Sequence, residues 1–179
     1  MEESIRRYSI KLYAYCLLTN HFHILVSPEK ADDLSKWMQW FMTSHVRRYH
    51  THYGTTGHVW QGRFKSFIVQ EDSHLLTAVR YIEGNPVRAG MVNSAAAWFW
   101  SSHSDRINGI EKTLSRLPIE LPPDWTSYVD EPLTDKELEK LRKSVNRQAP
   151  YGEEEWQIRI SVALGLGSTL KSRGRPRKR

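Results

Sequence analysis

Two histidines separated by one residue, His21 and His23, have a type and spacing that could do chemistry. They open an apolar run, 21–26, that is typical of a β-strand, in which side chains alternate between the two faces. Both imidazoles therefore project to the face opposite Phe22. Two imidazoles about 7 Å apart on one face can converge on a single divalent cation. Histidine pairs also arise by chance, so the pattern alone leaves a structural role open.

A tyrosine, Tyr81, is the second candidate. It lies in a helix that is predicted over 73–84, with Asp72 or Ser73 as its cap. The expected buried stripe of this helix is Leu75, Leu76, Val79 and Ile82. At about 100° per residue, Tyr81 lies on the far side of that stripe, and Asn85 lies one turn further on. Asn85 precedes Pro86 and should leave the helical region. We therefore expect Tyr81 to be presented rather than buried, grouped with His74, Ala78 and Asn85.

The residues around the polar pair Thr19-Asn20 predict a β-hairpin with strands over 10–18 and 21–26. Asp32 or Asp33 can then cap a helix over 33–49. Its apolar positions predict one face packed on a sheet: Leu34, Trp37, Met38, Phe41, Met42, His45, Val46 and Tyr49. On the opposite face Trp40 stands between Lys36 and Arg47. It either covers a neighbouring loop, which is favoured, or stacks on a base.

Trp60, Arg63 and Lys65 lie in a loop that is expected to lead into a strand near residue 69. An indole between cations suits contacts to bases and phosphates. A solvated loop with a packed tryptophan explains the same segment equally well. The aromatic run 98–100 is most simply a cap on the core.

The formal net charge of +6 is concentrated at one end of the chain. Residues 171–179 hold six basic residues and no acidic one, so the other 20 basic residues balance the 20 acidic ones. Within the body, residues 36–90 hold seven basic and three acidic residues, whereas 120–155 hold ten acidic and five basic. A basic central segment and a basic tail indicate a polyanionic partner.

Cysteine and hydropathy patterns indicate a cytoplasmic protein. The single cysteine, Cys16, excludes an intrachain disulfide and fits a reducing compartment. No apolar run reaches the ~18 residues that a membrane span needs, and the acidic start is unlike an export signal. We therefore expect no membrane partner.

The composition changes along the chain predict four parts. The first, 1–108, is large enough for one globular domain. A proline-containing linker follows over 109–133, then a small helical module over 134–170 with helices near 134–144 and 152–164. The basic tail, 171–179, completes the chain.

Taken together, these motifs resemble the HUH-type single-strand nucleases, and in detail the IS200-like transposases of the repeat-associated (REP-associated) tyrosine branch. Four co-linear segments and the tail carry the resemblance: 14–23 (AYCLLTNHFH), 60–65 (WQGRFK), 81–90 (YIEGNPVRAG), 100–103 (WSSH) and 173–178 (RGRPRK). The resemblance implies an α+β fold: a ferredoxin-like antiparallel sheet with helices on one face, followed by the helical module and tail. It also implies single-stranded or hairpin DNA as the partner and a nucleoid-associated location.

The resemblance assigns roles to particular residues. Tyr81 would be the nucleophile, which cleaves DNA through a 5′-phosphotyrosine and leaves a free 3′-hydroxyl. His21, His23 and Asn85 would bind the divalent cation, Mg²⁺ on abundance or Mn²⁺ on ligand softness. The DNA-binding residues would be Trp60, Arg63, Lys65, Arg80, Arg88, Arg173, Arg175 and Arg177. The Arg173-Gly174-Arg175-Pro176 segment also resembles the core of an AT-hook, the alternative being a tail that binds phosphates alone.

Free tyrosine has a pKa of about 10, so a nearby cation must favour the phenolate. The sequence offers the metal and either Arg80 or Lys65 for this purpose. The family's chains normally begin earlier, with a strand and a helix that precede the hairpin. We therefore expect an N-terminally incomplete sheet, which a second chain of a homodimer could complete. The function that competes with strand transfer is non-catalytic binding of DNA hairpins by a decayed or domesticated relative.

Overall fold

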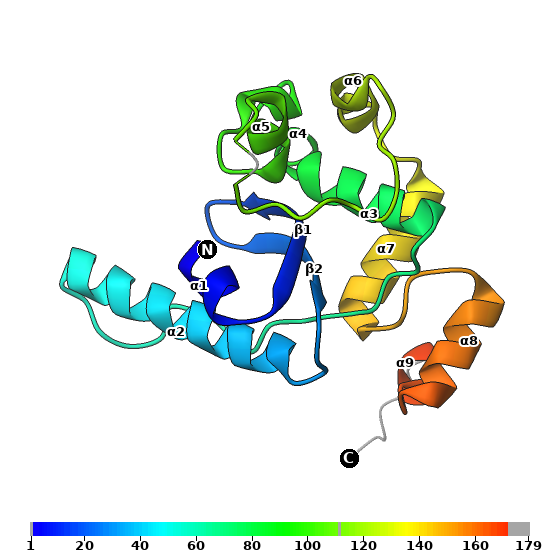
Figure 1. Ribbon diagram of the computed structural model, residues 1–179, viewed down its shortest axis with the longest axis horizontal. Helices are drawn as coiled ribbons and strands as arrows, with labels where there is room; N and C mark the ends of the chain where they lie inside the picture. Colours follow the sequence, from blue (N-terminus) through cyan, green and yellow to red (C-terminus); the bar gives the residue numbers. More distant parts are fainter. Residues whose placement is uncertain (1, 111, 172–179) are drawn as a thin grey trace, which may run out of the picture. The chain divides into compact units, whose positions relative to one another are not determined.

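The computed structural model describes residues 2–110 and 112–171. The described chain has the predicted α+β class, with one two-stranded antiparallel sheet and the helices around it (Figure 1). Such a sheet is consistent with an incomplete ferredoxin-like one. In chain order the elements are α1 Glu2–Arg7, β1 Ile10–Leu17, β2 Phe22–Pro28, α2 Asp33–Tyr53, α3 Ser73–Glu83, α4 Asn85–Arg88, the 3₁₀ turn η1 Ala95–Ala97, α5 Ser102–Ile107, α6 Trp125–Asp130, α7 Asp135–Arg147, α8 Glu154–Ala163 and α9 Gly167–Leu170.

The chain forms two compact units. The first consists of Met1–Phe64 and Val79–Pro132, and the second of Lys65–Ala78 and Leu133–Arg179. Helix α3 contributes its first residues to the second unit and its last residues, from Val79, to the first. The predicted candidates Tyr81, His21 and His23 all belong to the first unit.

The hairpin β1–β2 has the predicted turn, with strands that differ by one or two residues from the prediction. Cys16 pairs with His23, and the amide of Leu18 donates to the carbonyl of His21 at 2.9 Å across the turn. Strand β2 begins at Phe22, so His21 lies immediately before it. Tyr13 is an extra residue between two registers, because Leu12 pairs with Val26 and Ala14 with Leu25. This β-bulge bends β1 in its middle.

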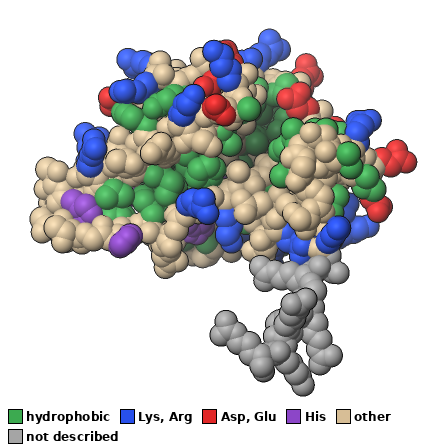
Figure 2. All heavy atoms as spheres, turned by 90° about the horizontal axis from the view of Figure 1, so that it is seen from below, with side chains coloured by type: hydrophobic (Ala, Val, Ile, Leu, Met, Phe, Trp, Pro, Cys, Tyr) green, Lys and Arg blue, Asp and Glu red, His purple; other side chains and the backbone are tan. Residues whose placement is uncertain are grey.

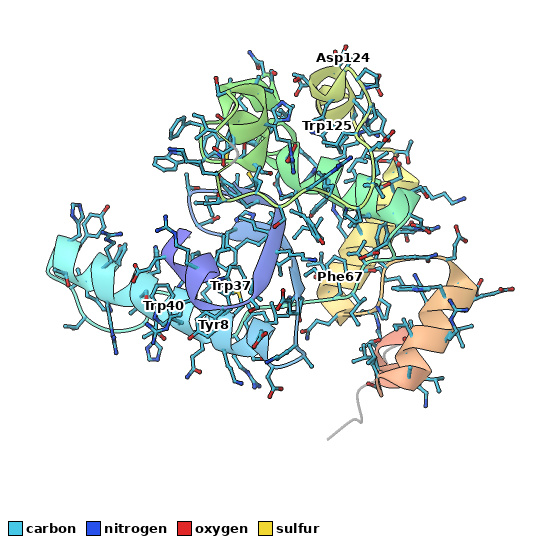
Figure 3. The ribbon with its side chains drawn as sticks, viewed as in Figure 1. Tyr8, Trp37, Trp40, Phe67, Asp124 and Trp125 are labelled. Atoms are coloured by element: carbon cyan, nitrogen blue, oxygen red, sulfur yellow. The ribbon has the colours of Figure 1, made fainter. Side chains whose placement is uncertain are left out.

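One face of the hairpin packs on α2, as the alternation of side chains predicts. The core here consists of Ile10, Trp37 and Met38, with Phe22, Ile24, Val26, Leu34, Phe41 and Met42 packed against it. Trp37, labelled in Figure 3, is fully buried and stacks on Phe41 with ring centroids 5.7 Å apart. The stripe does not stay buried to the end of the helix, because Tyr49 is 39% exposed. The helix ends at Gly54, whose left-handed φ of 61° is typical of a C-terminal cap.

The end of β1 pairs with the aromatic run, 98–100, and with Ser101, which follows it. Leu17 donates its amide to the carbonyl of Trp100 at 2.8 Å, and the indole of Trp98 donates to the carbonyl of Leu17 at 3.0 Å. Trp98 therefore packs, but Phe99 and Trp100 are 66% and 58% exposed, so they do not cap the core as we expected. On the face drawn in Figure 2, exposed apolar side chains also lie beside Lys and Arg side chains.

A buried carboxylate, Glu83, joins α3 to α5 and α6 within the first unit. Its Oε1 accepts hydrogen bonds from Ser102 Oγ at 2.5 Å and Arg106 Nε at 3.1 Å. Its Oε2 accepts one from Trp125 Nε1 at 2.7 Å and lies 3.3 Å from His103 Nδ1. Burial alone would raise the pKa of Glu83, but the hydrogen bonds from His103, Ser102 and Trp125 and the charge of Arg106 outweigh it and lower that pKa.

Two of these partners also bind the backbone of β1. Ser102 Oγ lies within hydrogen-bond distance of both the amide and the carbonyl of Tyr15, at 3.0 and 3.2 Å. Arg106 donates to the carbonyl of Tyr13 at the bulge. The Glu83 network therefore ties the end of α3 to the strand that pairs with β2.

Residues 112–132, in the segment predicted as a linker, pack within the first unit. Ser115 donates its amide to the carbonyl of Leu12 at 2.7 Å, and Asp124 caps α6 by accepting from the amide of Ser127 at 3.2 Å. Trp125 and Val129 are buried. Asp124 and Trp125 are labelled at the start of this helix in Figure 3.

In the second unit, Tyr151 is buried and its backbone pairs with the segment around Val69. The amide of Gln70 donates to the carbonyl of Tyr151 at 2.9 Å, and the amide of Tyr151 donates to the carbonyl of Ile68 at 2.7 Å. The strand expected near residue 69 is reduced to this single bridge, at Val69. Helix α7 begins with a capping box between Thr134 and Glu137, and both predicted C-terminal helices form.

Two further expectations concern the basic tail and the membrane. The tail residues Arg173, Arg175 and Arg177 lie outside the described residues. Among residues 2–110 and 112–171, no helix is both long and apolar enough to cross a bilayer.

Candidate active site

The tyrosine of α3 faces the histidine strand. The rings of Tyr81 and His23 meet edge to face, with centroids 5.6 Å apart and planes at 81°. Tyr81 is half-buried rather than displayed to solvent, and the predicted companions of its face, His74, Ala78 and Asn85, are buried. The expectation of a presented tyrosine was therefore wrong in this respect, because α3 is enclosed on more than its apolar stripe.

The two histidines lie against each other at the start of β2. Their ring centroids are 5.1 Å apart and their planes are nearly perpendicular, at 89°. His21 is exposed, and its Nδ1 lies 2.6 Å from the side-chain oxygen of Asn20. Because an amide oxygen can only accept, Nδ1 is the donor in this contact, and the tautomer leaves Nε2 as the lone-pair donor.

The imidazole of His23 is held neutral. Burial, then the neighbouring His21, then the charge of Arg88 lower its pKa from 6.5 to about 4. A neutral ring carries a lone pair, which metal binding requires. Near neutral pH this ring need not lose a proton to become a ligand.

We expect His23 in the metal-free protein to titrate near pH 4 rather than 6.5. Since folding disfavours its protonated form, its contribution to stability is complete above pH 6.5 and falls as the pH drops toward 4. The ring proton shifts of His23, assigned in NMR spectra through a His23→Gln variant, measure the midpoint. A His21→Ala variant should move the midpoint upward. A wild-type midpoint at the ordinary value would contradict the burial of this ring.

A cation lies on the tyrosine ring. The guanidinium of Arg88, from α4, is 4.0 Å from the ring centroid of Tyr81, and its Nη2 donates to the Tyr81 carbonyl at 3.3 Å. We predicted Arg88 only as a DNA contact. Its position places a positive charge where a phosphate approaching the Tyr81 hydroxyl would bring negative charge.

Arg80, which we predicted as a DNA contact or as the cation beside the tyrosine, points elsewhere. It is 7% exposed, its guanidinium lies 4.3 Å from the ring centroid of Tyr128, and it donates to the carbonyl of Glu131 at 3.0 Å. These contacts hold it at the end of α6. The geometry therefore assigns Arg80 a packing role and gives Arg88 the position beside Tyr81.

Three further predicted DNA contacts, Trp60, Arg63 and Lys65, lie in the segment 60–65. Trp60 is half-buried against Phe22 and His45, with centroids 5.4 and 5.0 Å away, which favours the packed-tryptophan alternative. Arg63 is exposed in the first unit, and Lys65 is exposed in the second.

Asn85 begins α4 rather than leaving the helical region. It is 7% exposed, and only Gly84 separates it from α3. An added Cβ on Gly84 would come within 3.0 Å of the carbonyl oxygens of Arg80 and Val129. Glycine thus lets the two helices follow each other almost without a break, with Pro86 in the first turn of α4, where proline is tolerated.

The donor set suits a divalent cation. Within the described residues, no group of three or more His, Cys, Asp or Glu side chains is placed to hold a metal. A cation on His21 and His23 would therefore take its other ligands from oxygen donors, such as an amide, water or the substrate. Two neutral imidazoles with oxygen ligands fit Mn²⁺ or Mg²⁺.

An antiparallel hairpin that sets a histidine pair against a helical tyrosine is the arrangement expected of a tyrosine transposase. Residues 1–85, which include β1, β2, α2 and α3, match the model of the family described as IS200-like transposases, and this part of the chain is similar to that family. Two curated relatives define the branch. A REP-associated tyrosine transposase of Haemophilus influenzae is 28% identical over 116 residues, and one of Escherichia coli K12 is 28% identical over 121 residues.

The similarity covers part of each protein. It spans 58% of this chain and 65% of the Haemophilus relative, and 66% of this chain and 66% of the Escherichia relative. No solved structure matches this chain significantly.

Proposed function

We propose that this protein cleaves and rejoins single-stranded DNA, with Tyr81 as nucleophile and His21, His23 and Asn85 as ligands of a divalent cation. The observation that carries the proposal is the contact of the Tyr81 ring with His23, 5.6 Å between centroids, beside the guanidinium of Arg88. The proposed nucleophile, the proposed histidine ligands and a cation suited to a phosphate therefore lie together, which supports the proposal. Hairpin-forming strands are the substrate that the REP-associated branch suggests.

The reaction exchanges one phosphodiester for another. The hydroxyl oxygen of Tyr81 bonds to the phosphorus, and the bond from phosphorus to the 3′-oxygen breaks. The proton that leaves Tyr81 is balanced by the one that the 3′-oxygen gains, so the products are a 5′-phosphotyrosine and a 3′-hydroxyl. Attack by another 3′-hydroxyl reverses these changes and joins a new strand.

The chain's own residues have separate tasks in this step. Arg88 attracts the phosphate to the tyrosine, and the buried surroundings of His23 keep that ring neutral as a ligand. The cation, when bound, would draw electron density from a phosphate oxygen and offset the charge that grows during attack. Either Mn²⁺ or Mg²⁺ satisfies this requirement.

The test is formation of a covalent adduct between the protein and a labelled DNA hairpin on a denaturing gel. We expect an adduct with Mn²⁺ or Mg²⁺ and none after chelation. A His21→Ala, His23→Ala variant should lose the adduct and still bind the hairpin, since contacts to phosphates supply most of the affinity. Cleavage by that double variant would disprove the metal assignment. Tight binding without any adduct from the wild type would instead favour a non-catalytic hairpin-binding protein.

A further inference from the structure

A groove along α2, closed on one side by Tyr8 just after α1, carries chemistry that Tyr81 and the histidine pair do not use. Its volume is about 310 Å³, and Lys36, Trp40 and Arg47 line it. Its other lining side chains are uncharged: Tyr8, Gln39, Thr43 and Ser44. Tyr8 and Trp40 are labelled in Figure 3, beside the place where α1 meets α2. None of the described residues that line the groove is acidic.

One face of α2 packs in the core, and the opposite face lines the groove. Lys36, Trp40 and Arg47 recur at helical spacing on the face opposite the centre of the apolar stripe that contains Trp37, Met38 and Phe41. Trp40 is nevertheless half-buried, because the guanidinium of Arg7 lies 5.8 Å from its ring centroid. A helix, α1, therefore lies against the indole, where the sequence led us to expect a loop. The core does not need this tryptophan.

The cations of the groove are only weakly engaged within the protein. Lys36 Nζ lies 3.9 Å from Asp32 Oδ2, and the two side chains are 61% and 85% exposed. An exposed pair at this distance stabilises the chain little, so the amine can turn to a phosphate. Lys36 and Arg47 are eleven residues apart, about 16 Å along the helix, which several nucleotides can span.

We propose that this groove binds a segment of single-stranded DNA, with Lys36 and Arg47 on phosphates and the indole of Trp40 stacked on a base. The chemistry favours this occupant, because a groove lined by cations and by no carboxylate suits a polyanion, and an indole suits the face of any base. The inference rests on the proposed function and adds a second DNA contact to it.

The groove is remote from the reacting phosphate. Helix α2 packs on the face of the hairpin that carries Phe22, Ile24 and Val26, whereas His23 meets Tyr81 on the other face. Changes in the groove should therefore weaken binding while the rate of adduct formation at saturating DNA stays at the wild-type value.

The salt dependence of binding tests the phosphate contacts. The affinity for a fluorescent DNA hairpin with a single-stranded extension is measured by anisotropy over a range of NaCl concentrations. Lys36→Gln with Arg47→Gln should reduce the slope of log affinity against log salt by about 1.4, since each phosphate on a single strand contributes about 0.7. The control, Lys140→Gln with Lys143→Gln on α7, removes the same charge and should leave the slope unchanged. Equal slopes in the groove variant and the wild type would overturn the phosphate contacts.

Substitutions of Trp40 test the stacked base. Trp40→Leu should weaken hairpin binding by about 5- to 150-fold, the range for one lost stack, and Trp40→Phe should keep most of the affinity. Thermal melts establish that both variants fold. If the wild type forms no adduct, the proposed function fails, whereas the binding measurements still decide the groove. An adduct together with unchanged affinity in Trp40→Leu would overturn the groove assignment alone.

Discussion

Replacing Tyr81 by phenylalanine is expected to abolish the covalent adduct with DNA, a loss of more than about a thousandfold, because the substitution removes the oxygen that we propose as the nucleophile. The ring remains, and with it the edge contact to His23 and the position under Arg88. Folding and hairpin binding should therefore change little. A denaturing gel measures the adduct, and anisotropy measures the binding.

A second tyrosine supplies the control for this experiment. Tyr49 lies on α2 and is 39% exposed, so Tyr49→Phe removes a tyrosine hydroxyl that does not belong to the proposed site. This variant should form the adduct at the wild-type rate. An adduct that persists in Tyr81→Phe and disappears in Tyr49→Phe would move the nucleophile to α2 and refute the site.

Removing the carboxylate of Glu83 should cost about 3–5 kcal/mol of folding free energy, because it leaves Arg106 and His103 without their buried acceptor. Urea unfolding of Glu83→Ala measures the loss, and Glu120→Ala, an exposed carboxylate, is the control. Combining Glu83→Gln with Arg106→Gln should recover part of the stability, since neither buried charge is then left alone. Losses that simply add would show that the two side chains do not form a pair.

The same carboxylate gives the stability a defined pH dependence. The pKa of Glu83 is lowered from its ordinary 4.5, so its contribution is complete above pH 4.5 and disappears as the pH falls through the lower, folded-state pKa. The difference in stability between wild type and Glu83→Gln should therefore shrink in acid. A difference that is constant from neutral pH into the acid range would mean that Glu83 is not ionised in the folded protein.

The parts of the fold that the sequence predicted are those that depend on local periodicity. The alternation along 21–26 placed Phe22 on the α2 side and His23 on the other, and the helical stripe containing Trp37 predicted where α2 packs. These patterns repeat within a few residues, so they need no knowledge of distant contacts.

The Glu83 network was missed because its partners are distant in the chain. Ser102 is 19 residues away and Trp125 is 42 residues away, and no periodic pattern connects them to α3. The one local signal was an acid next to the apolar Ile82 near the end of a buried helix. A charge in such a place requires partners, but the sequence does not say which ones.

The position of Arg88 beside Tyr81 was missed for a different reason. We expected the helix to end before Pro86. A helix that ends there gives no reason to expect Arg88 on the same side as Tyr81. In the structure α4 continues that phase after Gly84, whereas Arg80, one position before Tyr81, is turned toward Tyr128. Sequence proximity therefore suggested Arg80, whereas the guanidinium that lies on the Tyr81 ring is that of Arg88.

The short path from Tyr81 to Arg88 is also intolerant of changes in length. Seven residues make nearly two helical turns, which is why the guanidinium returns to the ring 4.0 Å from its centroid. One inserted or deleted residue would swing Arg88 by about 100° around the axis and carry it off the ring. Substitutions between Tyr81 and Arg88 therefore preserve the spacing of the two residues. A single insertion or deletion there moves the cation away from the tyrosine.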